Sequence, residues 1–173
     1  DHAGFSVSSA GDFNGEGFDD LLLGADRADI GGQTYVVFGQ GEHPGDIVQL
    51  ADLDGTNGFA ISAATSGEEA GHAVSVAGDV NGDGFSDLIV GAPRANADSN
   101  TDAGRSYVVF GHDGLAPPVL DLSTLDGTNG FVLDGVDPYD ASGYSVSSAG
   151  DVNGDGFDDL IIGAVDADQP GAA

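Results

Sequence analysis

The chain has 173 residues, 40% of them hydrophobic, and a formal net charge of −27 with only three basic residues. The hydrophobic content excludes a disordered chain, and the charge excludes nucleic acid and anionic membrane surfaces as partners, because both repel a polyanion. The lack of cysteine excludes a disulfide framework, and the lack of an apolar run of about 18 residues excludes insertion of a helix into a membrane.

The first predicted strands surround an acidic loop. One strand lies in GFSVSSAGD at residues 4–12, and a second follows the loop in LLLGAD. A third lies in TYVVFG at 34–39, and a fourth follows the turn sequence of LDGTNGF at 53–59. Apolar residues alternate with small polar ones or form short runs bounded by glycine. This pattern is typical of β-strands, and no stretch has a helical stripe.

The same order of segments recurs further along the chain. GHAVSVAGD occupies residues 71–79, SYVVFG 106–111 and LDGTNGF 125–131, and GYSVSSAGD opens a third copy at 143–151. Self-similarity of this kind indicates a repeat architecture. We therefore expect a single segment over residues 1–173, with repeats at approximately 1–67, 68–139 and 140–173.

Each copy carries a nine-residue acidic loop between its first and second strands. The loops read DFNGEGFDD at 12–20, DVNGDGFSD at 79–87 and DVNGDGFDD at 151–159. Oxygen-bearing side chains occupy positions 1, 3, 5 and 9, glycine permits a sharp turn at position 6, and the position-7 carbonyl is expected to point inward. The candidate metal ligands are Asp12, Asn14, Glu16, Phe18 and Asp20; Asp79, Asn81, Asp83, Phe85 and Asp87; and Asp151, Asn153, Asp155, Phe157 and Asp159.

The loop composition favours Ca²⁺, with up to three ions bound. Carboxylates about 4 Å apart repel one another by a few kcal/mol per pair, and a divalent cation reverses that sign. Five protein oxygens plus water suit Ca²⁺, whereas Mg²⁺ keeps most of its own water, and Zn²⁺ and Cu²⁺ are disfavoured because the loops contain neither histidine nor cysteine. We expect the first loop to be the loosest site, because its Glu16 is one methylene longer than the aspartate of the other two.

The loop composition is also compatible with two other structures. Asp, Asn and Gly also mark solvated turns, but three copies in the same context favour a metal. An EF-hand requires a bidentate glutamate at position 12, where these loops have Leu23, Val90 and Ile162. The aspartate at position 9 must therefore close the site.

Four short strands per repeat predict an all-β fold of four-stranded propeller blades, with two full repeats and the first hairpin of a third. A closed propeller needs about four to eight blades. Three arrangements stay open: the remainder of a longer propeller, a ring completed by a homo-oligomer, or an open partial assembly whose edges find partners.

The acidic loops, the Gly91-Ala92-Pro93 segment and the YVVFG strands together resemble the FG-GAP repeats of the integrin α-subunit propeller and its bacterial relatives, over nearly the whole chain. The resemblance implies that each loop joins the first two strands of a blade and binds Ca²⁺ on the lower face in a structural role. It also implies that ligands meet the opposite face.

The chain departs from this family pattern at two places. Ala3, Ala70 and Ser142 replace the phenylalanine of the FG pair. Its packing role would pass to Phe5 and Tyr144 two positions on, whereas His72 occupies that position in the second unit and speaks against the transfer. The GAP proline is present only at Pro93, and the other copies carry Asp26 and Val165 there.

No catalytic motif is evident, and we predict that the chain is not an enzyme. Its four histidines, His2, His43, His72 and His112, share no repeat position and are expected to be surface or packing residues. The predicted function is a calcium-binding propeller module of a secreted or cell-surface protein, where Ca²⁺ is millimolar, with a structural or adhesive role toward an unknown protein or glycan. Two alternatives remain: the non-catalytic propeller portion of an extracellular enzyme that degrades polysaccharide or phospholipid, or a self-assembling structural repeat. An enzyme would need a polar cluster outside the repeat pattern, and the sequence shows none.

Overall fold

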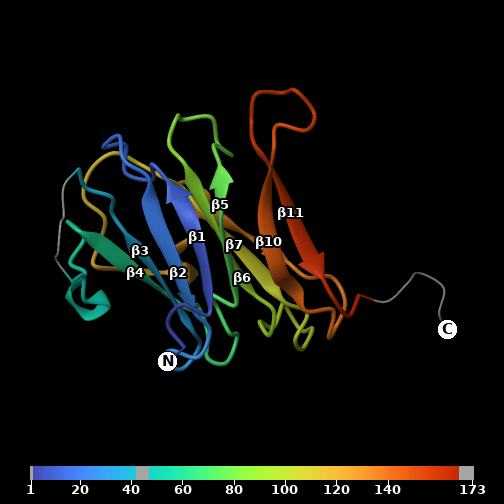
Figure 1. Ribbon diagram of the computed structural model, residues 1–173. Coiled ribbons are helices and arrows are strands. Elements are labelled where there is room, and N and C mark those ends of the chain that lie inside the picture. The colour runs from blue at the N-terminus through green and yellow to red at the C-terminus, as the bar shows by residue number, and fades with distance from the viewer. Residues whose placement is uncertain (1, 42–46, 168–173) are drawn as a thin grey trace.

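The computed structural model describes residues 2–41 and 47–167, which form three β-sheets standing side by side (Figure 1). The first sheet contains β1 (Ser6–Gly11), β2 (Asp20–Ala25), β3 (Gln33–Val37) and β4 (Gly58–Ser62). The second contains β5 (Ala73–Gly78), β6 (Asp87–Ala92), β7 (Arg105–Val109) and β9 (Gly130–Asp134). The third is a hairpin of β10 (Ser142–Gly150) and β11 (Asp159–Ala164).

Within each sheet these strands pair antiparallel in chain order. The predicted all-β architecture of two four-stranded blades and a third opening hairpin is thereby confirmed. The helical content is limited to two short 3₁₀ turns, Leu50–Asp52 and Leu122–Thr124, among the residues that the structure describes.

A further strand, β8 (Val119–Asp121), was not predicted. It belongs to the second unit by sequence but pairs in parallel with β4 of the first sheet, with Val119 opposite Ala60 and Leu120 opposite Ile61. The 3₁₀ turn that follows it buries Leu122. The segment between β7 and β9 therefore closes the outer edge of the preceding blade and ties the two units together.

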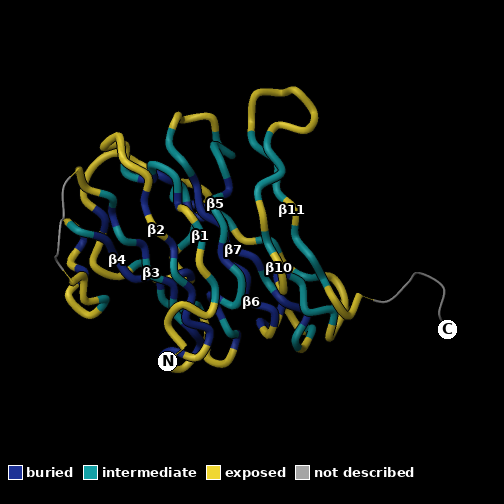
Figure 2. The backbone as a smooth tube through the Cα atoms, in the orientation of Figure 1, coloured by how far each residue is buried: buried dark blue, intermediate teal, exposed yellow. Residues whose placement is uncertain are grey.

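The hydrophobic core lies between the sheets, and equivalent residues show why. Leu88 and Ile89 are neighbours on β6 whose side chains point to opposite faces, and both are fully buried, because the second sheet has a neighbour on each side (Figure 2). In the first sheet the equivalent of Leu88 is Leu21, which is 58% exposed. In the hairpin the equivalent of Ile89 is Ile161, also 58% exposed. Both faces of a blade are therefore buried only where a neighbouring blade covers each of them.

Candidate metal-binding loops and a polar cluster

The three acidic loops all lie at one end of the sheets, at the top of Figure 1, as the turns β1–β2, β5–β6 and β10–β11. Each is preceded by an irregularity in strand pairing, next to Gly11, Gly78 and Gly150. These three glycines have φ of 63°, 84° and 66°, a left-handed conformation that favours glycine. The AGD sequence before each loop thus provides the bulge that turns the chain out of the first strand.

The aspartate at position 1 organises the backbone of its loop. In the second loop the Oδ1 atom of Asp79 accepts hydrogen bonds from the N–H groups of Gly82 at 2.7 Å and Asp83 at 3.1 Å, and its Oδ2 accepts one from Gly84 at 2.9 Å. Asp151 makes the same three bonds in the third loop. Backbone hydrogen bonds, against a small effect of burial, lower the pKa of Asp151, so it stays ionised.

The aspartate at position 9 joins the loop to the third strand of the blade. Asp87 is fully buried and accepts hydrogen bonds from the N–H groups of Val80 at 2.8 Å and Gly111 at 2.9 Å. Asp20 is equally buried and makes the equivalent pair of bonds at 3.0 and 2.8 Å. Burial raises the pKa of each carboxyl to about 6, although the backbone bonds oppose the shift. A cation beside these buried carboxylates would offset the cost of their burial.

Two features of the loops are relevant to the expected cation. The Oδ1 atom of Asp12 is buried and has no hydrogen-bond partner, so one carboxylate oxygen of the first loop is unsatisfied. None of the ion pairs among the described residues involves a loop carboxylate. The three arginines, Arg27, Arg94 and Arg105, pair with acidic residues elsewhere.

Neighbouring loops contact one another, which the sequence did not reveal. Asp158 of the third loop donates its N–H to the carbonyl of Asp79 at 3.0 Å, and its Oδ2 accepts the Asp79 N–H at 2.8 Å. The ring of Phe157 lies against Gly82, where an added Cβ would come within 2.5 Å of it. The ring of Phe85 meets Gly15 of the first loop in the same way. The phenylalanine at position 7, predicted to offer only its carbonyl, thus also packs its ring on the preceding loop.

At the opposite end of the sheets an aromatic row crosses the three units. The rings of Phe5 and His72 are 5.1 Å apart, and those of His72 and Tyr144 are 4.7 Å apart. His72 thus lies between Phe5 and Tyr144 in one row of ring contacts, although Phe5 and Tyr144 are each about half exposed.

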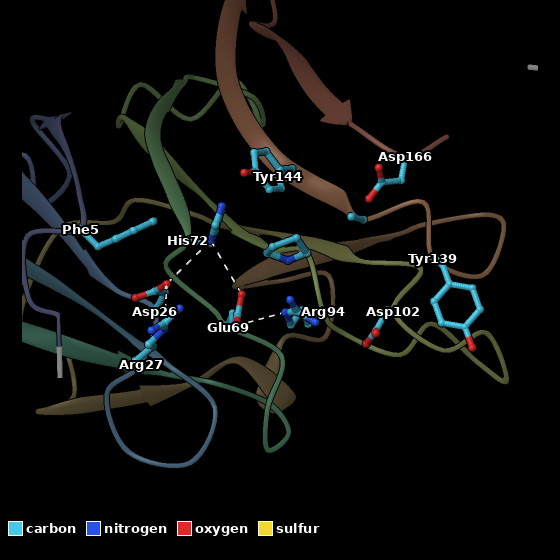
Figure 3. A pocket seen from close by; sticks show the side chains of 12 residues that line it. Phe5, Asp26, Arg27, Glu69, His72, Arg94, Asp102, Tyr139, Tyr144 and Asp166 are labelled. Atoms are coloured by element: carbon cyan, nitrogen blue, oxygen red, sulfur yellow. Dashed lines mark ion pairs between the residues drawn. The ribbon is translucent and has the colours of Figure 1, made fainter. Parts of the chain in front are cut away.

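A polar cluster adjoins this row in a cavity of about 410 Å³ (Figure 3). The Nδ1 atom of His72 lies 3.8 Å from Oδ2 of Asp26 and 3.9 Å from Oε2 of Glu69, and Oε1 of Glu69 pairs with Nε of Arg94 at 3.1 Å. The sequence pattern did not predict this cluster, and His72 was expected to be a surface or packing residue. A signal was available, because Asp26, Glu69 and His72 each occupy a position where the other repeats have a different kind of residue.

Among the residues that the structure covers, none forms a helix of the length and apolarity needed to cross a membrane.

The comparisons with known proteins agree with the repeat pattern. The FG-GAP repeat model matches residues 70–109 and 142–172, which contain the second and third acidic loops. Integrin alpha-7 of Mus musculus is 31% identical over 170 residues, and integrin alpha pat-2 of Caenorhabditis elegans is 29% identical over 167 residues. These alignments cover 94% and 95% of the chain but only 12% and 13% of the two relatives.

A third relative belongs to a different class of protein. Phosphatidylinositol-glycan-specific phospholipase D of Rattus norvegicus is 40% identical over 91 residues, which are 53% of this chain and 10% of that protein. The chain therefore corresponds to a small part of each of these proteins. Its blades, its acidic loops and these matches agree: the chain belongs to the FG-GAP repeat family and is related over most of its length to integrin α subunits.

Proposed function

We propose that the chain is a calcium-stabilised, non-catalytic β-propeller segment that acts as an adhesion or interaction module of a secreted or cell-surface protein. One observation carries this proposal: every unit places the same acidic loop at the same end of its first hairpin. In the two complete blades, a buried aspartate links that loop to the third strand. A feature present in every unit supports the fold of each blade rather than a single chemical event.

Calcium would be held by positions 1, 3, 5 and 9 of each loop and by the position-7 carbonyl, with up to three ions in all. The ion would neutralise carboxylates that otherwise repel one another, and would fix the β1–β2, β5–β6 and β10–β11 hairpins. With Ca²⁺ at ten times its dissociation constant, each site stabilises the fold by about 1.4 kcal/mol, and three sites by about 4 kcal/mol. We also propose that repeats 1–67, 68–139 and 140–173 act as one propeller segment.

The relatives support an extracellular interaction role. Integrin alpha-7 and integrin alpha pat-2 align along almost the whole chain, so we propose a cell-surface or secreted location and a protein or glycan ligand. Calcium sites of extracellular modules have dissociation constants of about 10⁻⁴ to 10⁻³ M, which millimolar extracellular calcium satisfies. The ligand would meet the end of the blades away from the loops.

The phospholipase D relative favours a second candidate, in which the chain is the propeller portion of an extracellular enzyme that degrades phospholipid. Here too the chain would be non-catalytic. Binding of the protein to arrays of immobilised proteins and glycans, compared with binding to vesicles that carry the phospholipid, separates the two candidates. The third candidate function is a self-assembling structural repeat. Measurement of the solution mass with and without Ca²⁺ tests it, because a monomer in both conditions argues against self-assembly.

Removal of calcium tests the structural role. Thermal unfolding followed by circular dichroism should show one cooperative loss of β structure, at a lower temperature in EGTA than in millimolar Ca²⁺. Excess Mg²⁺ should restore less stability than Ca²⁺, and added NaCl controls for simple screening of the acidic chain. An identical melting curve in Ca²⁺ and EGTA would show that the loops are only polar turns.

A further inference from the structure

The polar cluster of Asp26, Glu69 and His72 arises where the repeat pattern breaks. Asp26 follows β2 in the first unit, whereas Glu69 and His72 precede β5 in the second. No two of the three occupy the same position of the repeat. The equivalent residues of the other units are Pro93 and Val165 for Asp26, His2 and Ala141 for Glu69, and Phe5 and Tyr144 for His72. Three independent departures from the repeat thus converge on one point between two blades.

The geometry leaves two polar atoms of the cluster unsatisfied. Asp26 is only 4% exposed, yet its Oδ1 atom has no hydrogen-bond partner, and neither has the buried Nδ1 atom of His72. The Nδ1 atom of His2, whose side chain is half exposed, lies 3.4 Å from that Oδ1. A buried polar atom without a partner costs about 1–3 kcal/mol. Two of them lie on facing side chains, in a cavity reached from solvent (Figure 3).

We propose that Asp26, Glu69 and His72 bind a divalent transition-metal ion of the Zn²⁺ class, at the end of the molecule opposite the acidic loops. One ligand atom from each residue lies within 4.8 Å of the other two. An imidazole nitrogen with two carboxylate oxygens suits Zn²⁺, which binds such atoms at about 2.0–2.2 Å, whereas Ca²⁺ takes oxygen ligands. The fourth position faces the cavity, where water or a ligand group completes the coordination.

The separations between His72 and the two carboxylates are close to those of a tetrahedral metal site. A tetrahedral ion at about 2.1 Å from each ligand places its ligands about 3.4 Å apart. The observed separations from the Nδ1 atom of His72 are 3.8 and 3.9 Å. These two separations exceed the tetrahedral value by a few tenths of an ångström, and the separation between the Asp26 and Glu69 ligand atoms is within 4.8 Å. Rotation of the side chains therefore has to bring the two carboxylates together to close the site. The bound ion would link the first blade to the second, at the end that the predicted calcium ions do not reach.

The neighbouring arginines leave the ligand atoms accessible. Arg94 pairs with Oε1 of Glu69, so Oε2 remains available, and a guanidinium on the second oxygen orients the carboxylate as outer-shell partners of metal ligands do. Arg27 lies 4.0 Å from Asp26 and its side chain is 65% exposed, so it can turn away into solvent. The alternative without a metal is a network of ion pairs, in which His72 bridges the carboxylates of Asp26 and Glu69.

The test is a titration of the protein saturated with Ca²⁺, so that the acidic loops are already filled. Calorimetry with Zn²⁺ should show one site that is tighter than any residual binding. Visible absorption with Co²⁺ should show the intense bands of a four-coordinate ion. The variant His72→Tyr carries the residue of the third unit and keeps the aromatic row. Its affinity for Zn²⁺ at this site should fall by at least about 10-fold, because even the loss of an outer-shell partner has an effect of that size. The Co²⁺ bands should vanish.

Two further variants keep the result decisive. Asp26→Asn preserves the size of the buried side chain and should lose the site as well, which covers the case that His72→Tyr disturbs the fold. His112→Tyr removes an exposed histidine at the loop end of the molecule and should change nothing. Equal binding of Zn²⁺ by the wild-type protein and His72→Tyr would show that these residues do not bind the metal, and would favour the network of ion pairs. This outcome is independent of calcium-dependent melting, which concerns the other end of the blades.

Discussion

At the scale of single residues, the aspartate at position 9 connects the acidic loop to another segment of its blade. Asp87 has both oxygens engaged by backbone N–H groups of two different segments, whereas Asp159 in the third hairpin accepts only the N–H of Val152, at 2.8 Å, among the described residues. The repeat spacing predicts that both close a loop. It does not predict this difference, because the second bond depends on a third strand that the hairpin lacks in the described chain.

The substitution Asp87→Asn should therefore cost more than Asp159→Asn. An asparagine can accept only one of the two backbone bonds, and an unpaired buried N–H costs about 1–3 kcal/mol. Urea unfolding in Ca²⁺ and in EGTA measures the change, and Asp159→Asn, at the partly buried start of β11, is the matched control. Equal losses of stability in the two variants would show that the bond to Gly111 contributes nothing.

Glu68 is a second residue whose role only the structure reveals. It is 1% exposed and accepts hydrogen bonds from the N–H groups of Ala64 and Thr65, the Thr65 hydroxyl and the Tyr107 hydroxyl. Burial, followed by the charge of Glu68, raises the pKa of Tyr107 above its usual value, so the tyrosine remains a donor. In the sequence Glu68 lies between Gly67 and Glu69, a composition that is typical of a surface turn. Its partner Tyr107 is 39 residues away, so no local pattern indicates the buried contact.

We expect Glu68→Ala to lower the free energy of unfolding by about 3 kcal/mol, because it leaves the buried Tyr107 hydroxyl and the part-buried donors of Ala64 and Thr65 unpaired. Tyr107→Phe should cost less, about 1 to 2 kcal/mol, and Tyr35→Phe in the first unit less again, since Tyr35 is only half-buried and bonds to Gln33. Chemical unfolding of the three variants gives the order. A loss for Glu68→Ala no larger than for Tyr35→Phe would contradict a structural role for this carboxylate.

At the scale of elements, the hairpins and their loops were predictable, since alternation, glycine position and ligand spacing are all local in sequence. The contacts between hairpins were not, because they depend on how the blades stack. The side chain of Asp158 shows the difference: its neighbour Asp159 serves its own loop, but Asp158 reaches Asp79 of the preceding one. The equivalent Asp19 of the first loop is exposed and makes no such bond within the described chain.

The contact couples the second and third loops, so Asp158→Ala should weaken Ca²⁺ binding at the second loop. Loss of one hydrogen bond of about 1 kcal/mol corresponds to roughly a 5-fold change in affinity. Calcium titrations followed by NMR of the loop amides resolve the individual sites. Asp19→Ala is the control and should leave the second loop unchanged, whereas an equal effect of both variants would point to overall charge alone.

The first loop should release calcium before the other two. Asp12 keeps its bond from Gly17, but its Oδ1 atom lacks the backbone bonds that Asp79 and Asp151 make, and the longer Glu16 must be positioned without them. The same NMR titration gives the order of filling, and Glu16→Asp should tighten the first site. Equal occupancy of all three loops at limiting Ca²⁺ would be inconsistent with this difference.

At the scale of the whole molecule, β8 shows how one unit completes another. Its parallel pairing with β4 could not be predicted, because it is three residues long and its partner lies about one repeat away in sequence. The first unit contains a counterpart of β8 at residues 47–49, which belongs to no strand of the described chain and exposes Ile47 by 82% and Val48 by 51%. The second unit has a counterpart of β4 in β9, which pairs with β7 on one side only among the described strands.

These two edges are complementary, so the chain should associate head to tail, with 47–49 of one copy pairing beside β9 of another. The register of β4 and β8 places Ile47 opposite Val132 and Val48 opposite Leu133. Such a contact uses two different surfaces and therefore builds rings or open chains rather than closed dimers.

The average mass from light scattering should rise with protein concentration in Ca²⁺. Val48→Asp should weaken the association by at least about 10-fold, an effect of about 1.4 kcal/mol, because the charge would enter an apolar edge. Val136→Asp alters an even more exposed valine outside the strands and should leave the mass unchanged. A constant monomer mass at all concentrations would show that these edges do not pair between copies.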